Sequence, residues 1–505
     1  MRDFVREPPH SFAATLAQLG PGIVLASSIV GSGELIAATT VGAEAGFTLL
    51  WLVLIGCGIK VAAQVEIGRH TLAWGRTPLA AFDAVPGPRL AGRGWITWAW
   101  AVMTILIVVQ QGGILMGVAQ SLAGGLPLTA AGREWNRVHD AAAASRIAAA
   151  AARRSGDGET AAAAEARLAS LDAAAAGLPR PADETIWGAA VAATAAGLLA
   201  AGRYRFIERA AIILVGTFVA VTLLALALLQ FQPPWAISAA ELAGGLSFSV
   251  PRPDPAVGGR TPLATALATF GIIGVGASEL MFYPYWCLEK GYGRAVGPRE
   301  NSEAWSRRAR GWIRVLEIDA YASMVVYTLV TVAFYLLGAA TLGRLGIRPA
   351  GGEMVRTLGA MYEPVFGGWA AQLFPAAAFA VLFSTLIAAA DGNSRLIGDS
   401  LVLAGIVPDE ASARSRWTRR IAAAWPLLAG VLAVTIRAPV AMVLASGVAQ
   451  AIMLTALAVA VLFFRYRAAD PRLLPTRGRD ILLWLSAAGF MVAGCWTVWE
   501  KLLAR

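Results

Sequence analysis

Long apolar segments recur along nearly the whole chain and are separated by shorter polar stretches. Because a helix needs about 20 mostly apolar residues to cross the hydrocarbon core of a bilayer, each segment is a candidate transmembrane helix. Hydropathy and helix length predict eleven of them, at residues 17–43, 46–73, 94–123, 186–201, 207–231, 262–288, 312–341, 368–403, 418–435, 438–464 and 480–498. The pattern therefore predicts an all-α membrane protein embedded in a lipid bilayer.

The composition agrees with this prediction and excludes other classes. Of the 505 residues, 57% are hydrophobic and 15% are charged, and the mean hydropathy is +0.62, whereas about one quarter of a soluble domain is charged. The net charge of +10 could attract nucleic acid in a soluble protein, but the basic residues lie in loops between apolar segments, so no nucleic-acid partner is expected. Cys57, Cys287 and Cys495 lie in separate segments without CxxC spacing, which predicts neither a disulfide framework nor a thiolate metal site.

Lysine and arginine concentrate in alternate loops, and this pattern predicts the orientation of the chain. They are Arg76, Arg89, Arg93, Arg203, Arg205, Lys290, Arg294, Arg299, Arg307, Arg308, Arg310, Arg414, Arg416, Arg419, Arg420, Arg465, Arg467, Arg472, Arg477 and Arg479. The connection GAEAGF at 42–47 carries neither residue type. Since positive loops stay in the cytoplasm, we expect the N-terminus inside and the C-terminus outside the cytoplasmic (inner) membrane. The first residues, MRDFVREPPHSF, lack a short apolar core, so no cleavable signal peptide is expected.

Residues 129–185 depart from this composition, because they are rich in alanine with interspersed charges. Alanine is the best helix former, and the SGDG stretch at 155–158 favours a turn. We therefore expect an extracytoplasmic helical hairpin inserted between the third and fourth transmembrane helices. The hairpin is either a decoration of this lineage, a disordered loop or a binding site for a partner.

Two similar hexamers, VGSGEL at 30–35 and VGASEL at 275–280, interrupt two apolar segments with small residues. Glycine tolerates non-helical backbone, and unwound backbone survives in a membrane only where it is buried in protein or lines a cavity. Interrupted helices at corresponding positions of two halves are typical of transporters built from inverted repeats, with a substrate site near the bilayer midplane. We therefore expect a five-plus-five repeat at 17–231 and 262–464, broken helices one and six, and an extra helix at 480–498.

Each hexamer places a glutamate at the same point, Glu34 in the first and Glu279 in the second. A carboxylate at mid-membrane costs about 2.5–3.5 kcal/mol on insertion scales, so it usually faces a cavity or a partner. If both glutamates are ionised, they form an acidic site suited to a cation. Either could instead be a packed, protonated group, or one could exchange protons with the cation.

Several stretches resemble the Nramp (natural resistance-associated macrophage protein) metal transporters. GPGIVLASSIVGSGELIAATTVGAEAGFTLLWLVL at 20–54 resembles their first two helices, AWGRTPLAAF at 73–82 the end of the second, and AQSLAGGLPL at 119–128 the end of the third. The resemblance extends over nearly the whole chain apart from the segment 129–185. It implies a divergent member of the family, with eleven helices, a cytoplasmic N-terminus and no cofactor, for which a metal ion is the transported substrate.

The metal-binding residues of the family carry over only in part. Its first-helix signature, Asp-Pro-Gly-Asn, has Asp and Asn as metal ligands and aligns with GSGE at 31–34. Only the glycine is kept: one ligand position is Gly31 and the other is Glu34. In the sixth helix Ala277 can still offer a carbonyl oxygen, but the methionine position holds Leu280 and the histidine position holds Phe282. The acidic residues of the family's proton path are absent from the third-helix window VVQQGG at 108–113.

These departures indicate a hard metal ion. Thioether and imidazole ligands favour softer transition metals, whereas carboxylates, carbonyls and water suit Mg²⁺, Ca²⁺ and Mn²⁺. Our first expectation is therefore alternating-access transport of a hard divalent cation such as Mg²⁺ or Mn²⁺. Transporters of this architecture also carry organic solutes, so a small organic cation or amino acid is the alternative. The third possibility is a membrane sensor that has lost transport.

The candidate substrate-binding residues come from three of the expected helices. They are Gly31, Ser32, Glu34, Ala277, Ser278, Glu279, Asp391 and Asn393, of which Glu34, Glu279 and Ala277 are the candidate metal ligands. Gly31 and Ala277 are expected to offer carbonyl oxygens from unwound backbone. Asp391 precedes Arg395 by four residues, an order that stabilises a helix, so it is either a secondary acid of the site or a structural partner. Asp319 lies near the cytoplasmic start of the seventh helix, where interfacial solvation explains it. No Walker motif or nucleophile elbow occurs, so we expect no enzyme.

Overall fold

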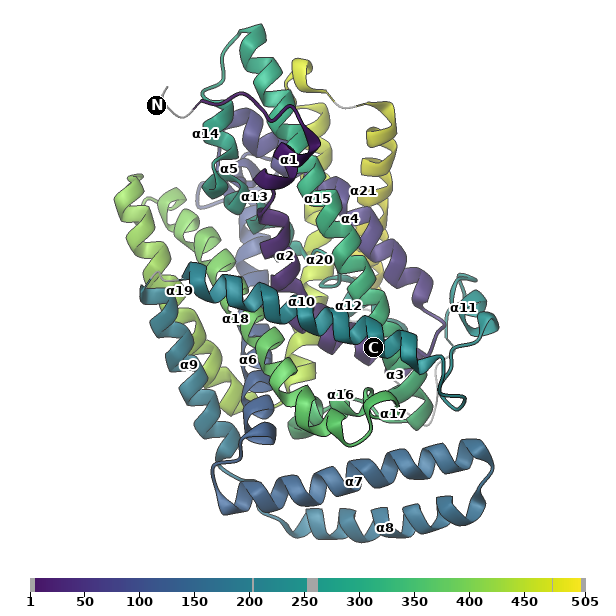
Figure 1. The fold of residues 1–505 in the computed structure, drawn as a ribbon. Coiled ribbons are helices and arrows are strands. Elements are labelled where there is room, and N and C mark those ends of the chain that lie inside the picture. Colours follow the sequence, from purple (N-terminus) through teal and green to yellow (C-terminus); the bar gives the residue numbers. More distant parts are fainter. Residues whose placement is uncertain (1–4, 202–203, 252–261, 475, 501–505) are drawn as a thin grey trace.

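The computed structural model describes residues 5–201, 204–251, 262–474 and 476–500, which fold almost entirely into helices (Figure 1). A single pair of two-residue strands, antiparallel to each other, is the exception within these residues. In chain order the elements are α1 Phe12–Gln18, α2 Pro21–Ile29, η2 Val30–Ala38, α3 Thr39–Ala45, α4 Leu50–Trp74, α5 Pro78–Asp83, β1 Arg89–Leu90, β2 Arg93–Gly94, α6 Trp95–Gly125, α7 Ala130–Ser155, α8 Gly158–Gly177, α9 Asp183–Ala201, α10 Tyr204–Leu229, α11 Ala239–Gly245, α12 Pro262–Phe270, α13 Ala277–Lys290, α14 Tyr292–Val296, α15 Glu303–Leu337, η4 Gly338–Gly343, η5 Gly351–Glu353, α16 Met354–Ala360, α17 Glu363–Phe366, α18 Trp369–Leu403, α19 Ala411–Ile436, α20 Pro439–Tyr466, η6 Pro471–Leu473 and α21 Arg477–Val498.

Nine helical segments in the described part of the chain are long and apolar enough to cross a membrane. They are Pro21–Ala45, Leu50–Trp74, Trp95–Gly125, Asp183–Ala201, Glu303–Gly343, Gln372–Leu403, Ala411–Ile436, Pro439–Tyr466 and Arg477–Val498. Two other expected helices appear as α10, which has a shorter apolar part, and as the interrupted pair α12 and α13. The predicted all-α, multi-pass membrane fold is thus confirmed. Arg203, which contributed to the expected orientation, lies outside the described residues.

The long helices pack around α6. This helix contacts α9, α18, α19 and α20, while α4 packs against α15, α13 and α21. The continuous segment α2–η2–α3 lies against α15 and α18. In Figure 1, α10 crosses the other long helices at a steep angle. The segments that carried the two hexamers, η2 and the start of α13, are therefore enclosed by other helices.

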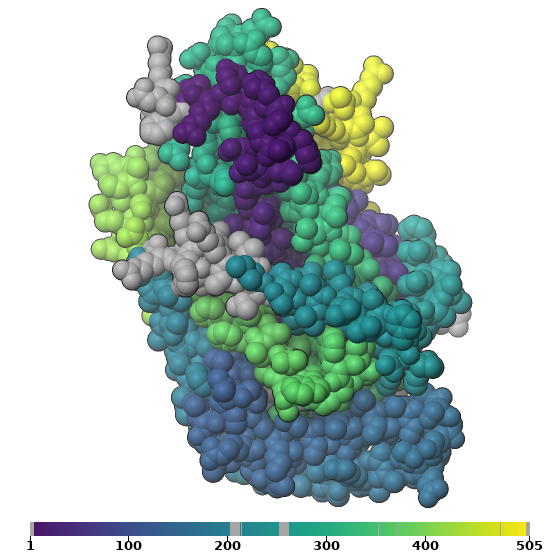
Figure 2. Space-filling view, in the orientation of Figure 1, coloured from purple at the N-terminus to yellow at the C-terminus, as the bar shows by residue number. Residues whose placement is uncertain are grey.

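The inserted segment forms two antiparallel helices, α7 and α8, which lie along one end of the molecule (Figures 1 and 2). We call this the hairpin end. Gly156 ends α7 in the left-handed conformation (φ 79°), which glycine adopts without steric cost. Asp157 then begins α8 by accepting a hydrogen bond from the amide of Thr160 at 3.0 Å. Two ion pairs join the helices, Arg146–Asp172 and Arg153–Glu165.

The insertion leaves and rejoins the bundle at one point, which we call the neck. Asp183, the first residue of α9, accepts hydrogen bonds from the amides of Leu128 at 2.6 Å and Thr129 at 3.1 Å. Its other oxygen accepts from the Thr129 hydroxyl at 2.5 Å. Because Asp183 is 1% exposed, one buried carboxylate fixes both ends of the hairpin to each other.

The first hexamer lies in a continuous helical segment, in contrast to the expected open break. Within this segment η2, which contains residues 30–35, is wound as a π-helix. Its glycines permit close packing: a Cβ atom on Gly31 would lie 2.4 Å from the Thr385 hydroxyl, and one on Gly33 would lie 2.9 Å from the Ile272 carbonyl oxygen. The expectation of unwound backbone at 30–35 is therefore corrected to a widened helix, in which small residues admit neighbours.

The second segment does break. Helix α12 ends at Phe270 and α13 begins at Ala277, so residues 271–276, called the break below, are non-helical. Gly274 adopts a positive φ of 60°, which L side chains rarely take. A Cβ atom on Gly271 would lie 2.1 Å from the Gly447 carbonyl oxygen, so α20 packs directly on the break.

Candidate functional site

Glu34 reaches across from η2 to the break. Its Oε1 accepts a hydrogen bond from the amide of Gly274 at 3.0 Å and one from the hydroxyl of Thr331 at 2.7 Å. The residue is 0% exposed, and its second oxygen, Oε2, has no hydrogen-bond partner. A buried carboxylate oxygen without a donor is costly, so this atom has the capacity to take a further positive or donor group.

Lys60 places a positive charge at the same break, and the sequence analysis missed it. Its Nζ donates to the carbonyl oxygens of Phe270 and Ile273, the latter at 2.8 Å, and the residue is 0% exposed. Lys60 comes from the middle of α4, an apolar membrane-spanning helix. A single lysine at such a position is by itself a signal for a functional site, and this signal could have identified it.

A chain of hydrogen bonds connects the two hexamers through neighbouring helices. The Gln110 amide of α6 donates to the Ser32 hydroxyl at 3.1 Å and accepts from the Gln450 amide of α20 at 3.0 Å. The Gln450 oxygen in turn accepts from the backbone amide of Ser278 at 3.2 Å. Ser278 then donates its hydroxyl to Glu279 Oε2 at 2.9 Å, and Glu279 is 8% exposed. The two serines and Glu279 therefore belong to one buried polar network.

Gly31 and Ala277, the candidate carbonyl donors, both lie in helical backbone. Gly31 is part of η2, and its amide donates to the Thr385 hydroxyl of α18 at 3.1 Å. Ala277 is the first residue of α13 and is fully buried. The expectation that they lie in unwound backbone is thus corrected, while their role as ligands stays a prediction.

Asp391 and Asn393 make their polar contacts with residues outside the two hexamers. Asp391 pairs with Arg395 at 2.5 Å and accepts from the Trp286 indole at 3.2 Å. The Asn393 amide donates to the Ala389 carbonyl of its own helix at 2.9 Å. Of the two readings for Asp391, these contacts favour the structural partnership with Arg395, although its candidate role in the site stays a prediction.

Asp319, near the middle of α15, holds three segments together. Its two carboxylate oxygens accept from the amides of Gly20 at 3.0 Å and Gly22 at 2.6 Å, and from the Tyr283 hydroxyl at 2.9 Å. It is 2% exposed, so solvation at an interface does not account for it. The contacts join α15 to the start of α2 and to α13, and we call them the Asp319 latch.

The residues around the break offer oxygen atoms of carboxylates and of neutral side chains. The described residues contain no group of three or more His, Cys, Asp and Glu side chains placed to hold a metal. Around the break, a cation would meet Glu34, Glu279 and neutral oxygens of serine and glutamine side chains. These are hard oxygen ligands, which Mg²⁺ and Mn²⁺ accept together with retained water.

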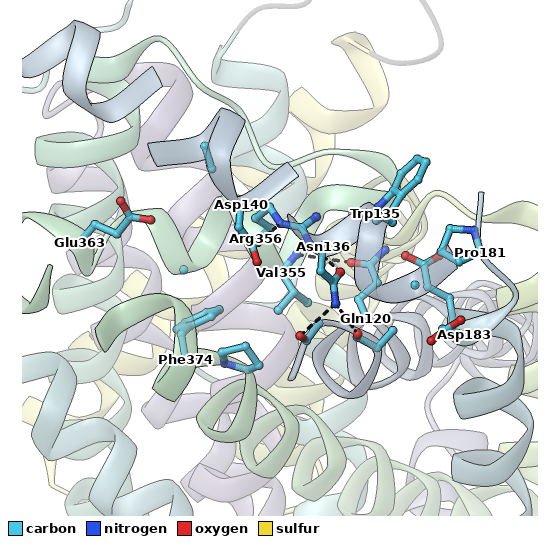
Figure 3. A pocket seen from close by; sticks show the side chains of 17 residues that line it. Gln120, Trp135, Asn136, Asp140, Pro181, Asp183, Val355, Arg356, Glu363 and Phe374 are labelled. Atoms are coloured by element: carbon cyan, nitrogen blue, oxygen red, sulfur yellow. Dashed lines mark hydrogen bonds and ion pairs between the residues drawn. The ribbon is translucent and has the colours of Figure 1, made fainter. Parts of the chain in front are cut away.

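A separate pocket lies at the hairpin end, between α7 and the segment α16–α18 (Figure 3). Within it Arg356 contacts Asp140 at 2.6 Å and Asn136 at 2.9 Å, so α16 is tied to α7. His139 of α7 contacts Glu353 of η5 at 2.9 Å beside this pocket. The hydrogen bond from His139 lowers the pKa of the Glu353 carboxyl. These contacts fasten the hairpin to the connection between α15 and α18.

Comparisons with known proteins agree with this fold. A family model described as natural resistance-associated macrophage protein-like matches residues 147–500. A mutant of the Eremococcus coleocola manganese transporter has a TM-score of 0.62 at 15% identity, covering 98% of this chain and 89% of that chain. The same transporter in complex with an aromatic bis-isothiourea substituted compound has a TM-score of 0.61 at 16% identity, with the same coverage of 98% and 89%. MhsT in complex with L-phenylalanine has a TM-score of 0.52 at 15% identity, covering 98% and 100%. No curated protein matches the sequence.

The likeness to the solved structures shows a shared fold, and the family match goes further because it spans more than half of the chain. Members of this family are transporters and not enzymes; they carry no cofactor, and a metal is their transported substrate. The resemblance seen in the sequence is thereby confirmed, and the chain belongs to the Nramp family of membrane transporters.

Proposed function

We propose that the chain is a secondary transporter that moves a hard divalent metal cation, such as Mg²⁺ or Mn²⁺, across the cytoplasmic membrane by alternating access. The proposal assigns Glu34 and Glu279 as the acidic groups of the site. Ser32 and Ser278, linked through the glutamine network, contribute neutral oxygens. The hairpin end faces outward and the Asp319 latch faces the cytoplasm, in agreement with the charge pattern of the loops.

One observation carries the proposal: Glu34 Oε2 is fully buried beside the break and has no partner. Its companion oxygen is already held by Gly274 and Thr331, so the carboxylate is fixed in position while one oxygen stays free. A cation entering the site would bind this free oxygen. The replacement of thioether and imidazole by oxygen ligands supports a hard cation.

The direct test is flux in proteoliposomes that contain the purified full chain. We expect uptake of Mg²⁺ or Mn²⁺ that saturates with concentration and is competed by the other ion. Empty liposomes report the leak. Absence of saturable uptake of any divalent ion, with saturable uptake of an organic solute, contradicts the metal assignment.

The second candidate is transport of a small organic cation or amino acid. The lack of a cluster of three metal-type side chains in the described residues favours it, and the shared fold with MhsT, whose solved structure is in complex with L-phenylalanine, supports it. Uptake of labelled amines and amino acids in the same liposomes distinguishes the two candidates. A sensor that has lost transport would bind a ligand without flux of any solute.

A further inference from the structure

The contact between Lys60 and the break has the chemistry of a cation site. A helix that ends leaves its last carbonyl groups without intrahelical donors, and the C-terminal end of a helix carries a partial negative charge. Phe270 is the last residue of α12 and Ile273 lies in the break that follows it, and the carbonyl oxygens of both accept from the Lys60 ammonium. In transporters with interrupted helices, such carbonyl groups coordinate small cations.

The surroundings of the ammonium group point to a cation rather than to a neutral donor. Glu34 accepts from the amide of Gly274, the residue that directly follows Ile273, so the carboxylate and the ammonium bind the N–H and the C=O of one peptide group. The Phe270 ring lies 4.9 Å from Nζ, at a distance suited to a cation–π interaction. One turn further along α4, both amide atoms of Gln64 are buried without a partner, which extends the polar surroundings on this face of the helix.

We propose that the carbonyl oxygens of Phe270 and Ile273 form a subsite for a monovalent cation, which the chain fills with its own Lys60 ammonium. Because the ammonium is covalently attached, the subsite is occupied without Na⁺ or K⁺ from solution. The inference goes beyond the proposed function, since it concerns a cation that stays in place and not the cation that is transported.

The positive charge of the Lys60 ammonium affects the whole site. The ammonium offsets one of the two negative charges that Glu34 and Glu279 carry when ionised. It also keeps the two carbonyl oxygens away from the transported ion. The side chains of the glutamates and the neutral oxygens of the network are then left for that ion.

The test removes the ammonium and offers replacements. The full chain carrying Lys60→Ala is purified in detergent, and its thermal unfolding is followed by tryptophan fluorescence in choline chloride without divalent ions. We expect a midpoint below that of the wild type, which methylammonium, Na⁺ or K⁺ raises by several degrees at constant ionic strength. The wild type keeps one midpoint in all these salts.

Two further variants separate a subsite from a general salt effect. Lys60→Met fills the space with an apolar side chain, so its midpoint is expected to be insensitive to the cation. Lys290→Ala removes a lysine from the far end of α13, and its midpoint is expected to be equally insensitive. The proposal is overturned if small cations raise the midpoints of Lys60→Ala and Lys60→Met alike. It is also overturned if the midpoint of Lys60→Ala is the same in choline as in methylammonium, Na⁺ and K⁺.

Should Lys60→Ala aggregate in choline, purification in methylammonium provides the same test. The proposal requires that methylammonium restores a monodisperse protein and that choline does not. Since no divalent ion is present, the result is independent of metal transport. The unfolding test can contradict the subsite while the flux test supports metal transport, and the opposite combination is equally possible.

Discussion

Glu34 and Glu279 stand at the same point of two similar hexamers but have different surroundings. Glu34 is held by groups from outside its own segment, Gly274 and Thr331, and keeps one oxygen free. Glu279 accepts from its neighbour Ser278, which is in turn held by Gln450. Glu34 is therefore the more rigidly positioned charge, and it is the better candidate for setting affinity.

Replacing Glu34 by glutamine keeps the volume and an acceptor oxygen but removes the charge. We expect Glu34→Gln to weaken the apparent affinity for the transported divalent ion by about 10- to 100-fold, because an interaction with a charged group contributes about 1.5–3 kcal/mol. Concentration-dependent uptake in proteoliposomes measures the effect. Glu303→Gln, an exposed change in the first turn of α15, is the matched control and should leave uptake unchanged. Equal affinities for all three proteins would make Glu34 structural.

Gly31 offers a test of the packing explanation for the first hexamer. A Cβ atom there would lie 2.4 Å from Thr385 Oγ1 and 2.9 Å from Thr385 Cβ, so Gly31→Ala should lower the free energy of unfolding by about 1–3 kcal/mol through overpacking. Gly58→Ala is the control, because a Cβ atom at Gly58 has no neighbour within 4 Å and alanine is the better helix former. Thermal unfolding should therefore separate the two variants in opposite directions. If Gly31→Ala is as stable as the control, close packing does not explain this glycine, and backbone flexibility is the remaining explanation.

The sequence predicted two acidic candidate residues, Glu34 and Glu279, but not the groups that bind them. Glu34 and Glu279 were recognisable because a repeated hexamer places each carboxylate in an apolar segment. Gln110 and Gln450 are 340 positions apart, so only the folded chain shows that they connect the two hexamers. Lys60 was open to the same reasoning as the glutamates, but its carbonyl partners exist only because α12 ends at Phe270.

At the scale of elements, the Asp319 latch joins three helices through one buried carboxylate. Asp319→Ala would leave the amides of Gly20 and Gly22 and the Tyr283 hydroxyl without this acceptor. Each buried group left unsatisfied costs about 1–3 kcal/mol, so we expect a thermal midpoint several degrees below that of the wild type. Asp409→Ala is the control, since Asp409 is exposed in its ion pair with Arg414 and such pairs contribute about 0–1 kcal/mol. A latch variant as stable as this control would mean that water replaces the lost contacts.

The two hexamers show how far a local pattern determines an element. Small residues at 30–35 and 275–280 predicted two open breaks, and the structure has a π-helix at the first and a break ending at the second. Glycine permits both unwinding and close approach, and the chain around it does not distinguish them. The contact that decides is Thr385 against Gly31, and it comes from a helix more than 300 positions away.

At the scale of the whole molecule, the hairpin end is expected to respond to pH through Glu363. Burial, together with the nearby Asp140 of α7, raises the pKa of the Glu363 carboxyl from 4.5 to about 7. Between these values the folded protein binds more protons than the unfolded chain, so this carboxyl makes stability fall as pH rises from 4.5 to about 7. Glu363→Gln should flatten this part of the profile, as measured by thermal unfolding at each pH, while Glu303→Gln should keep it. An unchanged slope in Glu363→Gln would assign the pH dependence to another group.

Hydropathy predicted the membrane-spanning helices more reliably than it predicted the contacts between helices. Apolar length predicted the membrane-spanning helices, because the bilayer imposes that length on any crossing. The contact of α7 with α16 through Arg356 and Asp140 could not be predicted, because the sequence around an exposed charge in an alanine-rich helix does not indicate which residue pairs with it.

The neck gives the molecule a practical property. Since Asp183 fixes Leu128 and Thr129 beside the start of α9, both ends of the hairpin are held at one point of the bundle. Its tip, at Gly156 and Asp157, lies in a turn between two capped helices. A rigid protein tag or an antibody epitope grafted into that turn would act as a fiducial mark outside the micelle. Such a mark makes a 52.7 kDa membrane protein large enough in projection for particle alignment by electron cryo-microscopy.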